Sequence, residues 1–228
     1  MTAEISHLDW FPCYRLIPSR FPPIGLFDRV ASLEDLEAVS AIESLTNDRL
    51  RDEIGEISLA PPEERIVGPG ASPIMAAFTH LNPEGSRFSD GTYGVYYAGE
   101  SLDTSIPEVA YHRTLFLSRT REAAMEIDLR TYTARVVGDF HDLRGQQDAL
   151  PDFYARCDYA ASQALGRSLR ASGSSGVVYD SVRRAGGQCV AVFRPRLISD
   201  CSQSSHITFV WDGARIVSWY EKSELRNL

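Results

Sequence analysis

The chain has 228 residues, of which 43% are hydrophobic and 24% are charged, as in an ordinary globular domain. Its 23 basic and 31 acidic residues give a net charge of −8, which disfavours proteins that bind the nucleic-acid backbone. No apolar run approaches the ~18 residues that a membrane-spanning helix needs. Residues 1–7 lack the basic and apolar regions of a signal peptide. We therefore expect a soluble, cytoplasmic protein.

The cysteines and histidines show no ligand or disulfide spacing. The four cysteines, at positions 13, 157, 189 and 201, are scattered and form no C-x-x-C pair, which indicates reduced thiols. The five histidines are equally scattered, so we expect no metal site. Phosphate-loop and nucleophile-elbow motifs are also absent from the sequence.

Apolar periodicity and turn residues predict the elements in chain order. Strands are expected at 13–18, 75–80, 93–98, 125–129, 134–137, 176–182, 189–193, 206–211 and 216–220. Helices are expected at 32–54, 106–117 and 153–171, and a proline-rich and glycine-rich loop at 59–73.

Local signals support two of these elements. Ser32 and Asp35 stand at capping-box spacing before the first helix. Asp212-Gly213 predicts a hairpin between the last two strands. Short strands mixed with a few helices indicate an α+β fold. No change of composition divides the chain, so we expect a single domain over residues 1–228. Its core spans about 13–210, and the helical segment at about 32–54 elaborates it.

Four short segments carry the candidate chemistry. They are Cys13-Tyr14-Arg15, Gly85-Ser86-Arg87-Phe88-Ser89-Asp90-Gly91, Val95-Tyr96-Tyr97-Ala98 with Glu108 beyond it, and Val177-Val178-Tyr179-Asp180-Ser181-Val182-Arg183 leading into Gly186-Gly187. In this order they resemble the RES-domain family, which is named for an arginine, a glutamate and a serine. Arg87, Glu108 and Ser181 match those three residues.

The resemblance implies a toxin of a bacterial type II toxin–antitoxin system, with an Xre-like helix-turn-helix antitoxin as its partner. It also implies a fold similar to that of ADP-ribosylating toxins, and an enzyme that consumes NAD+ without a metal. Members of the family cleave NAD+ by hydrolysis or phosphorolysis, or transfer ADP-ribose to a protein. The acceptor therefore stays open between water, phosphate and a protein side chain.

Two other functions are weighed against this one. The first is a non-catalytic NAD+-binding module that retains the fold, which the intact set of Arg87, Glu108 and Ser181 disfavours. The second is a nucleic-acid-cleaving toxin, which the net charge of −8 disfavours.

The matched residues suit the implied reaction. Cleavage of the nicotinamide–ribose bond develops positive charge on the ribose, and a carboxylate beneath the sugar stabilises that charge. Glu108 is predicted to supply the carboxylate, and Ser181 to bind the ribose or the carboxamide or to orient Glu108. Arg87 is predicted to bind the diphosphate, with Arg15 as a second contact. Tyr96 is predicted to stack on the nicotinamide.

The same residues also have ordinary structural interpretations. Ser105-Ile106-Pro107-Glu108 has the spacing of a capping box, so Glu108 can mark a helix start. Arg87 can be an exposed turn residue, and Arg15 a charge at a strand edge. Tyr96 and Tyr97 face opposite sides of a strand, so one of them belongs to the core. The family pattern selects Tyr96 for the site.

Two positions depart from the family pattern. Ser89 stands where many members have an asparagine, and we expect it to leave one contact unmade or water-mediated. Gln188 replaces a second asparagine after the glycines.

Overall fold

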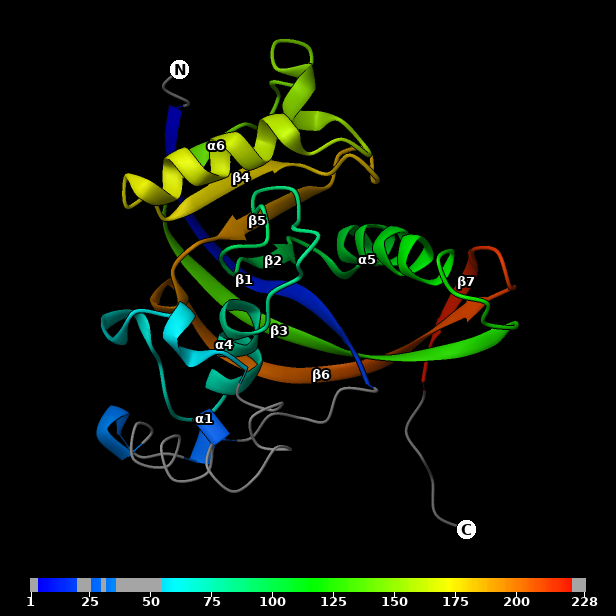
Figure 1. Ribbon diagram of the computed structural model, residues 1–228, viewed down its shortest axis with the longest axis horizontal. Helices are drawn as coiled ribbons and strands as arrows, with labels where there is room; N and C mark the ends of the chain where they lie inside the picture. Colours follow the sequence, from blue (N-terminus) through cyan, green and yellow to red (C-terminus); the bar gives the residue numbers. More distant parts are fainter. Residues whose placement is uncertain (1–3, 20–25, 30–31, 36–54, 223–228) are drawn as a thin grey trace.

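The computed structural model describes residues 4–19, 26–29, 32–35 and 55–222 (Figure 1). Within these residues seven strands form one sheet in the order β1-β2-β5-β4-β3-β6-β7. The strands are β1 (Glu4–Pro18), β2 (Tyr96–Gly99), β3 (Met125–Asp142), β4 (Gly176–Asp180), β5 (Gln188–Val192), β6 (Ile198–Trp211) and β7 (Ile216–Glu221). The helices are α1 (Leu26–Arg29), α4 (Ala71–Thr79), α5 (Leu102–Leu117) and α6 (Ala160–Ala171), with short 3-10 turns that include η3 (Pro151–Tyr154). The predicted α+β class is confirmed.

The long strands β1 and β3 close the sheet partly on itself. β1 pairs antiparallel with β3 along nearly its whole length, and Tyr14 of β1 also pairs with Gly99 of β2. β2 pairs with β5, β5 with β4, and β4 runs parallel to the end of β3 at His141 and Asp142. Strands β1, β2, β5, β4 and β3 therefore form a closed ring of hydrogen-bonded neighbours. β6 and β7 extend the sheet from β3 (Figure 1).

Alternation of side chains along the strands separates two apolar layers. One layer joins β2, β4 and β5 to α4, through Tyr96, Val178, Val190, Val192, Ile74 and Phe78. The other layer joins the same strands to α6 and the loop before β2, through Val177, Tyr179, Ala191, Phe88, Leu165 and Leu169. In Figure 1, α6 lies across β4 and α5 lies toward β7.

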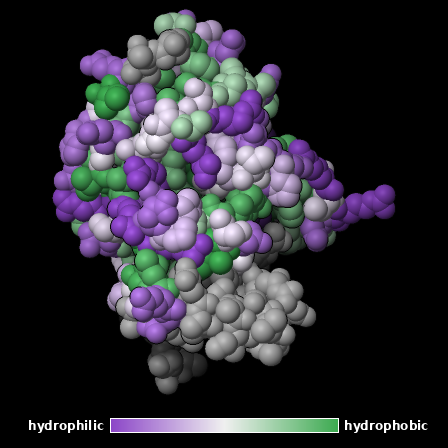
Figure 2. Space-filling view, turned by 60° about the vertical axis from the view of Figure 1, so that its left-hand side comes forward, coloured by the Kyte–Doolittle hydropathy of each residue, from purple (hydrophilic) through white to green (hydrophobic). Residues whose placement is uncertain are grey.

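α5 packs on a third cluster formed by β1, β3 and β6. Ile106 and Val109 of the helix face Leu16, Leu129 and Ile207 of the strands. On the described part of the face seen in Figure 2, hydrophilic side chains predominate and hydrophobic ones form separate patches. Among the described residues, no helix is long and apolar enough to cross a membrane.

Several predicted elements are confirmed. The strand at 13–18 belongs to β1, the helix at 106–117 belongs to α5, and the strands at 176–182 and 189–193 match β4 and β5. The hairpin joins β6 and β7, where the Asp212 carboxylate accepts the N–H groups of Ala214 and Arg215 at 2.8 Å each. Asp35 N–H donates to Ser32 Oγ at 3.1 Å, as the capping spacing predicts. The rest of the predicted 32–54 helix, from residue 36 on, lies outside the described residues.

One predicted strand is wrong, and two further predictions are correct only in part. The expected strand at 75–80 belongs to helix α4, whose side chains are buried on several sides, so its apolar run lacks a helical stripe. The expected strands at 125–129 and 134–137 are one strand, β3. Arg130 and Thr131 interrupt its apolar pattern, and both are buried in the structure.

The helix expected at 153–171 is confirmed only over its second part, 160–171. It is the turn η3 followed by α6, which begins only at Ala160. The residues between them, 155–159, are extended or turned, and Asp158 accepts the N–H of Ala160 at 2.9 Å. This non-helical segment lies beside the candidate site described below.

Candidate functional site

The candidate site lies between α5 and the turn that follows β4. Glu108 of α5 accepts a hydrogen bond from Ser181 Oγ on Oε1 at 2.6 Å. Its other oxygen, Oε2, accepts from Nη1 of Arg183 at 2.9 Å. The fold therefore brings together Glu108 and Ser181, which are 73 positions apart in the sequence. Ser181 was predicted to bind the ribose or the carboxamide or to orient Glu108, and this contact corresponds to the last of these roles.

Helix α5 places Glu108 in its second turn. The helix begins after Ser101, whose Oγ accepts the N–H of Thr104 at 3.2 Å. The capping-box interpretation of Ser105 and Glu108 is therefore wrong, because Ser105 lies inside the helix. Its hydroxyl instead donates to the carbonyl of Tyr14 at 2.8 Å and ties α5 to β1. Glu108 makes no cap and is available to the site.

The turn after β4 fixes the direction of the Ser181 hydroxyl. Ser181 Oγ accepts the backbone N–H groups of Arg183 at 3.1 Å and Arg184 at 3.0 Å. With both acceptor positions occupied, its single proton donates to Glu108. Gly187 lets this turn approach α5, since a Cβ there would lie 2.6 Å from Thr104 Oγ1.

Arg87 is buried beside the same cluster, with 5% of its surface exposed. Its Nη1 donates to the carbonyls of Phe153 at 2.8 Å and Ala155 at 3.0 Å. The guanidinium lies 4.7 Å from the centre of the Tyr159 ring. The exposed-turn interpretation of Arg87 is therefore wrong. Its Nη2 is buried without a hydrogen-bond partner, so the guanidinium keeps an unused charged donor.

The loop that carries Arg87 is anchored on both sides of the arginine. The hydroxyl of Tyr97 hydrogen-bonds Ser86 Oγ at 2.8 Å and accepts the N–H of Phe88 at 2.9 Å. Ser89 Oγ donates to a backbone carbonyl at 2.6 Å and accepts a backbone N–H at 3.2 Å. Both hydrogen bonds of Ser89 stay within the loop, and the expectation that it leaves one contact of the family asparagine unmade or water-mediated stays a prediction. Gly85, at φ +74°, makes the tight start of this loop.

Sequence reasoning gave no role to four residues that complete the cluster. Arg183 reaches Glu108, stacks at 3.7 Å from the centre of the Tyr111 ring, and donates to the hydroxyl of Tyr159 at 3.1 Å. His112 contacts both tyrosine rings. Tyr111 and His112 follow Glu108 by three and four residues, so their spacing on the helix was the available signal.

The cluster carries a surplus of positive charge. Burial, together with the nearby charge of Arg183, lowers the pKa of His112 to about 4, so its ring is neutral near pH 7. The cluster then holds one carboxylate, Glu108, and two guanidinium groups: Arg183, which pairs with Glu108, and Arg87, which lies over the Tyr159 ring. The site carries one net positive charge and suits an anionic ligand.

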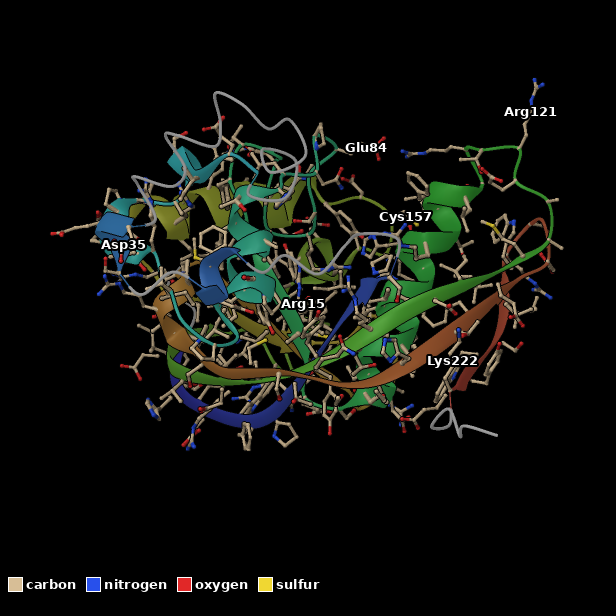
Figure 3. All side chains as sticks on the ribbon, turned by 90° about the horizontal axis from the view of Figure 1, so that it is seen from below. Arg15, Asp35, Glu84, Arg121, Cys157 and Lys222 are labelled. Atoms are coloured by element: carbon tan, nitrogen blue, oxygen red, sulfur yellow. The ribbon has the colours of Figure 1, made fainter. Side chains whose placement is uncertain are left out.

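Arg15 and Tyr96 form a separate pair on the other face of β2. The Arg15 guanidinium lies 4.8 Å from the centre of the Tyr96 ring, and its Nη1 donates to the carbonyl of Tyr97 at 3.3 Å. Arg15 pairs with Tyr132 of β3 and β1 also pairs with β2, so Arg15 is not a strand-edge charge; Figure 3 labels its position. Burial lowers its pKa. The tyrosine beside the Arg87 loop is Tyr97, whereas Tyr96 is fully buried in the layer under α4.

Phenylalanine at the two adjacent tyrosines is expected to change stability in opposite directions. The Tyr96 hydroxyl is buried without a partner, so Tyr96→Phe should raise the free energy of unfolding by about 1 kcal/mol. Tyr97→Phe removes two hydrogen bonds and should lower it by about 1–3 kcal/mol. Urea unfolding of both variants tests this. Equal destabilisation by the two substitutions would show that Tyr96 OH has a partner in solution.

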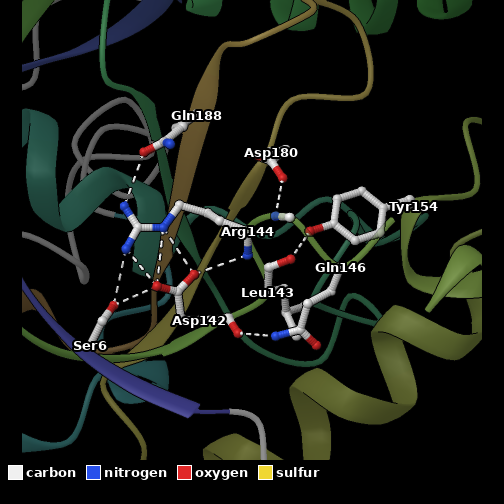
Figure 4. Close-up of polar contacts among 9 residues, drawn as sticks. Ser6, Asp142, Leu143, Arg144, Gln146, Tyr154, Asp180 and Gln188 are labelled. Atoms are coloured by element: carbon white, nitrogen blue, oxygen red, sulfur yellow. Dashed lines mark hydrogen bonds and ion pairs between the residues drawn. The ribbon is translucent and has the colours of Figure 1, made fainter. Parts of the chain in front are cut away.

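A second polar network fixes the strand ends that support the site (Figure 4). Arg144 lies at its centre and donates to side chains from β1, β3 and β5: Ser6, Asp142 and Gln188. Asp180, directly before Ser181, accepts the N–H of Gly145 at 2.6 Å. The network therefore joins the end of β4 to the loop that supplies carbonyl groups to Arg87. Gln188 takes part through its side chain.

The four cysteines are free thiols, as predicted. Cys157 is exposed beside α5, where its Sγ lies 3.3 Å from the hydroxyl of Tyr111 (Figure 3). Within the described ranges, no three histidine, cysteine or acidic side chains gather in a way that could hold a metal ion.

Comparison with known proteins identifies the class to which this fold and site belong. The family model described as RES domain matches residues 62–212, more than half of the chain, so the chain belongs to the RES-domain family. The match includes Arg87, Glu108, Ser181 and Arg183, whereas Arg15 precedes it. The chain is 34% identical over 225 residues to the uncharacterized protein y4oC of Sinorhizobium fredii (strain NBRC 101917 / NGR234), covering 98% of this chain and 92% of that one. The toxin–antitoxin complex MbcT–MbcA of M. tuberculosis contains a similar chain, with 17% identity, a TM-score of 0.45, and coverage of 91% of this chain and 88% of that one.

Proposed function

We propose that this protein cleaves the nicotinamide–ribose bond of NAD+ and is the toxin of a toxin–antitoxin pair. The observation that carries the proposal is the Glu108 carboxylate, held on one oxygen by Ser181 and on the other by Arg183. Arg87, with its unused buried donor, is joined to this carboxylate through the Tyr159 ring and Arg183. Membership of the RES-domain family agrees with an NAD+-consuming enzyme.

The reaction needs one carboxylate and one anion-binding group. The C1′–N bond of the nicotinamide ribose breaks, its electron pair stays on the departing nicotinamide, and positive charge develops on the ribose. The Glu108 carboxylate stabilises this charge more strongly in the transition state than in the bound substrate. The acceptor then attacks C1′ through an oxygen or nitrogen atom and releases a proton to solvent.

Arg87 is assigned to the diphosphate of the substrate. A diphosphate is a strong acceptor, and a guanidinium offers two donors in a planar fork. The net positive charge of the cluster adds a favourable field for this anion. The roles predicted for Arg15 as a second diphosphate contact and for Tyr96 as a nicotinamide stack stay predictions.

The proposal includes a partner. A free NAD+ consumer would deplete the cell that makes it, so we expect an antitoxin that neutralises it, of the Xre-like helix-turn-helix type that the family resemblance implies. The acceptor of ADP-ribose, whether water, phosphate or a protein, is set by geometry on the opposite face of the ribose.

Nicotinamide release by the purified protein tests the proposal. Release with protein alone indicates hydrolysis, and a strong increase with inorganic phosphate indicates phosphorolysis. Labelled ADP-ribose on a lysate protein, with little release otherwise, indicates a transferase. NAD+ that binds without turnover under all three conditions would identify a binding module and overturn the proposed chemistry.

A further inference from the structure

Arg183 is the most heavily engaged side chain beside Glu108 and stands outside the arginine, glutamate and serine of the family name. Its side chain is 5% exposed. Nη1 donates to Glu108 at 2.9 Å, and Nη2 donates to the carbonyl of Arg156 at 2.9 Å and to the hydroxyl of Tyr159 at 3.1 Å. The guanidinium plane also lies over the Tyr111 ring. These contacts come from α5 and from the segment 155–159, so the position of the guanidinium is fixed from two sides.

The two contacts on Glu108 come from one turn. Ser181 holds Oε1 and Arg183 holds Oε2, while the backbone N–H of Arg183 donates to Ser181 Oγ. The turn therefore fixes the positions of both oxygens of the Glu108 carboxylate. A glutamate side chain rotates about three torsions, and a two-sided hold is what confines it to one orientation.

The two buried arginines of the site differ in what they leave unused. Arg183 uses Nη1 for Glu108 and Nη2 for protein acceptors, and only its Nε is buried without a partner. Arg87 binds only backbone carbonyls through Nη1 and leaves Nη2 without a partner. A guanidinium whose two terminal nitrogens are both engaged, one of them by the carboxylate, suits positioning, whereas one with a terminal nitrogen left unpaired suits an incoming anion.

We propose that Arg183 is a positioning residue, which holds the Glu108 carboxylate in the orientation that faces the ribose, while Arg87 alone of this pair binds the substrate anion. This inference rests on the proposed function. It assigns the two arginines to different kinetic steps: Arg183 to the rate of bond cleavage and Arg87 to substrate affinity.

Kinetics of Arg183→Ala separate these roles. We expect kcat for nicotinamide release to fall about 100-fold, because small misplacement of a reacting group has this effect. KM should stay within about threefold of wild type. Added guanidinium ion, at concentrations far below those that unfold proteins, should restore about tenfold of the lost rate by filling the vacated space. Urea at equal concentration should not, and a Glu108→Gln/Arg183→Ala double variant should not respond.

Arg184→Ala is the matched control. Arg184 is the next residue of the same turn, but its half-exposed side chain reaches Asp103 at 3.2 Å rather than Glu108. Its removal should leave kcat and KM unchanged. If Arg183→Ala fails to fold, Arg183→Lys replaces it. The lysine keeps the charge but cannot make the forked contacts, and kcat should still fall about tenfold.

Three results would overturn the inference. The first is an unchanged kcat in the folded Arg183 variant. The second is a raised KM at constant kcat, which would make Arg183 a substrate ligand. The third is the absence of rescue by guanidinium.

A crystal structure of the variant supplies a readout that does not depend on activity. It should show Glu108 turned away from its wild-type orientation, and an unmoved carboxylate would contradict positioning even if wild type itself proved inactive on NAD+. In that case the inactivity would count against the proposed function alone.

Discussion

Glu108→Gln is expected to lower the rate of nicotinamide release by about 1,000-fold or more while NAD+ still binds. Glutamine keeps the size of the side chain but removes the negative charge that stabilises the developing positive charge on the ribose. Its amide oxygen can still accept from Ser181, whereas its NH2 group cannot accept from Arg183, so one of the two contacts is lost and the other keeps the turn in place. Nicotinamide release and calorimetric binding of NAD+, measured on the same preparation, separate chemistry from affinity.

Glu84→Gln is the matched control for this substitution. Glu84 is exposed and pairs with Arg119 at the surface, away from the contacts of the site. Activity of Glu84→Gln should equal that of wild type. Full activity of Glu108→Gln would contradict the assignment of Glu108 as the carboxylate that stabilises the transition state.

Arg87→Met is expected to weaken NAD+ binding by about 10–100-fold, because it removes a charged hydrogen-bond donor worth about 1.5–3 kcal/mol. The same substitution leaves the carbonyls of Phe153 and Ala155 without their donor, so the free energy of unfolding should fall by about 1–3 kcal/mol. Calorimetry measures the affinity, and urea unfolding measures the stability.

Arg167→Met controls for loss of a positive charge near the same loop. Arg167 is about half exposed and pairs with Asp90 at 2.9 Å. Arg167→Met should change neither the free energy of NAD+ binding nor the free energy of unfolding by more than about 0.5 kcal/mol. An Arg87 variant with unchanged affinity for NAD+ would remove Arg87 from the diphosphate role.

The sequence was sufficient for the parts of the fold that depend on neighbouring residues. The Asp212-Gly213 hairpin, the strand ends around Gly186-Gly187 and the helix of Glu108 follow from local turn and periodicity signals. The strand β3 and helix α4 did not, because their residues are buried on more than one side. Arg130 is buried in the middle of β3, so the apolar–polar alternation that marks a strand is interrupted there. The side chains of α4 are buried on several sides, so its sequence lacks the apolar period that marks a helix.

The candidate site was only partly predictable for a related reason. The family pattern selected Glu108 and Ser181, and the structure places them in contact. It could not show which face of β2 meets the Arg87 loop, because that choice depends on the pairing of distant strands. The structure places Tyr97 there and Tyr96 on the opposite side. Arg183 lies in the segment that carries Ser181, but its contacts depend on residues 155–159, for which the periodicity predicts a helix.

A single experiment tests directly whether the nicotinamide ribose of NAD+ lies against Glu108 with the diphosphate on Arg87. The measurement is a crystal structure of the Glu108→Gln variant with NAD+, in which slow turnover preserves the intact substrate. We expect the ribose in contact with residue 108 and a phosphate oxygen within hydrogen-bond distance of Arg87 Nη2. NAD+ bound elsewhere on the protein, or a site that stays empty at saturating NAD+, would contradict it.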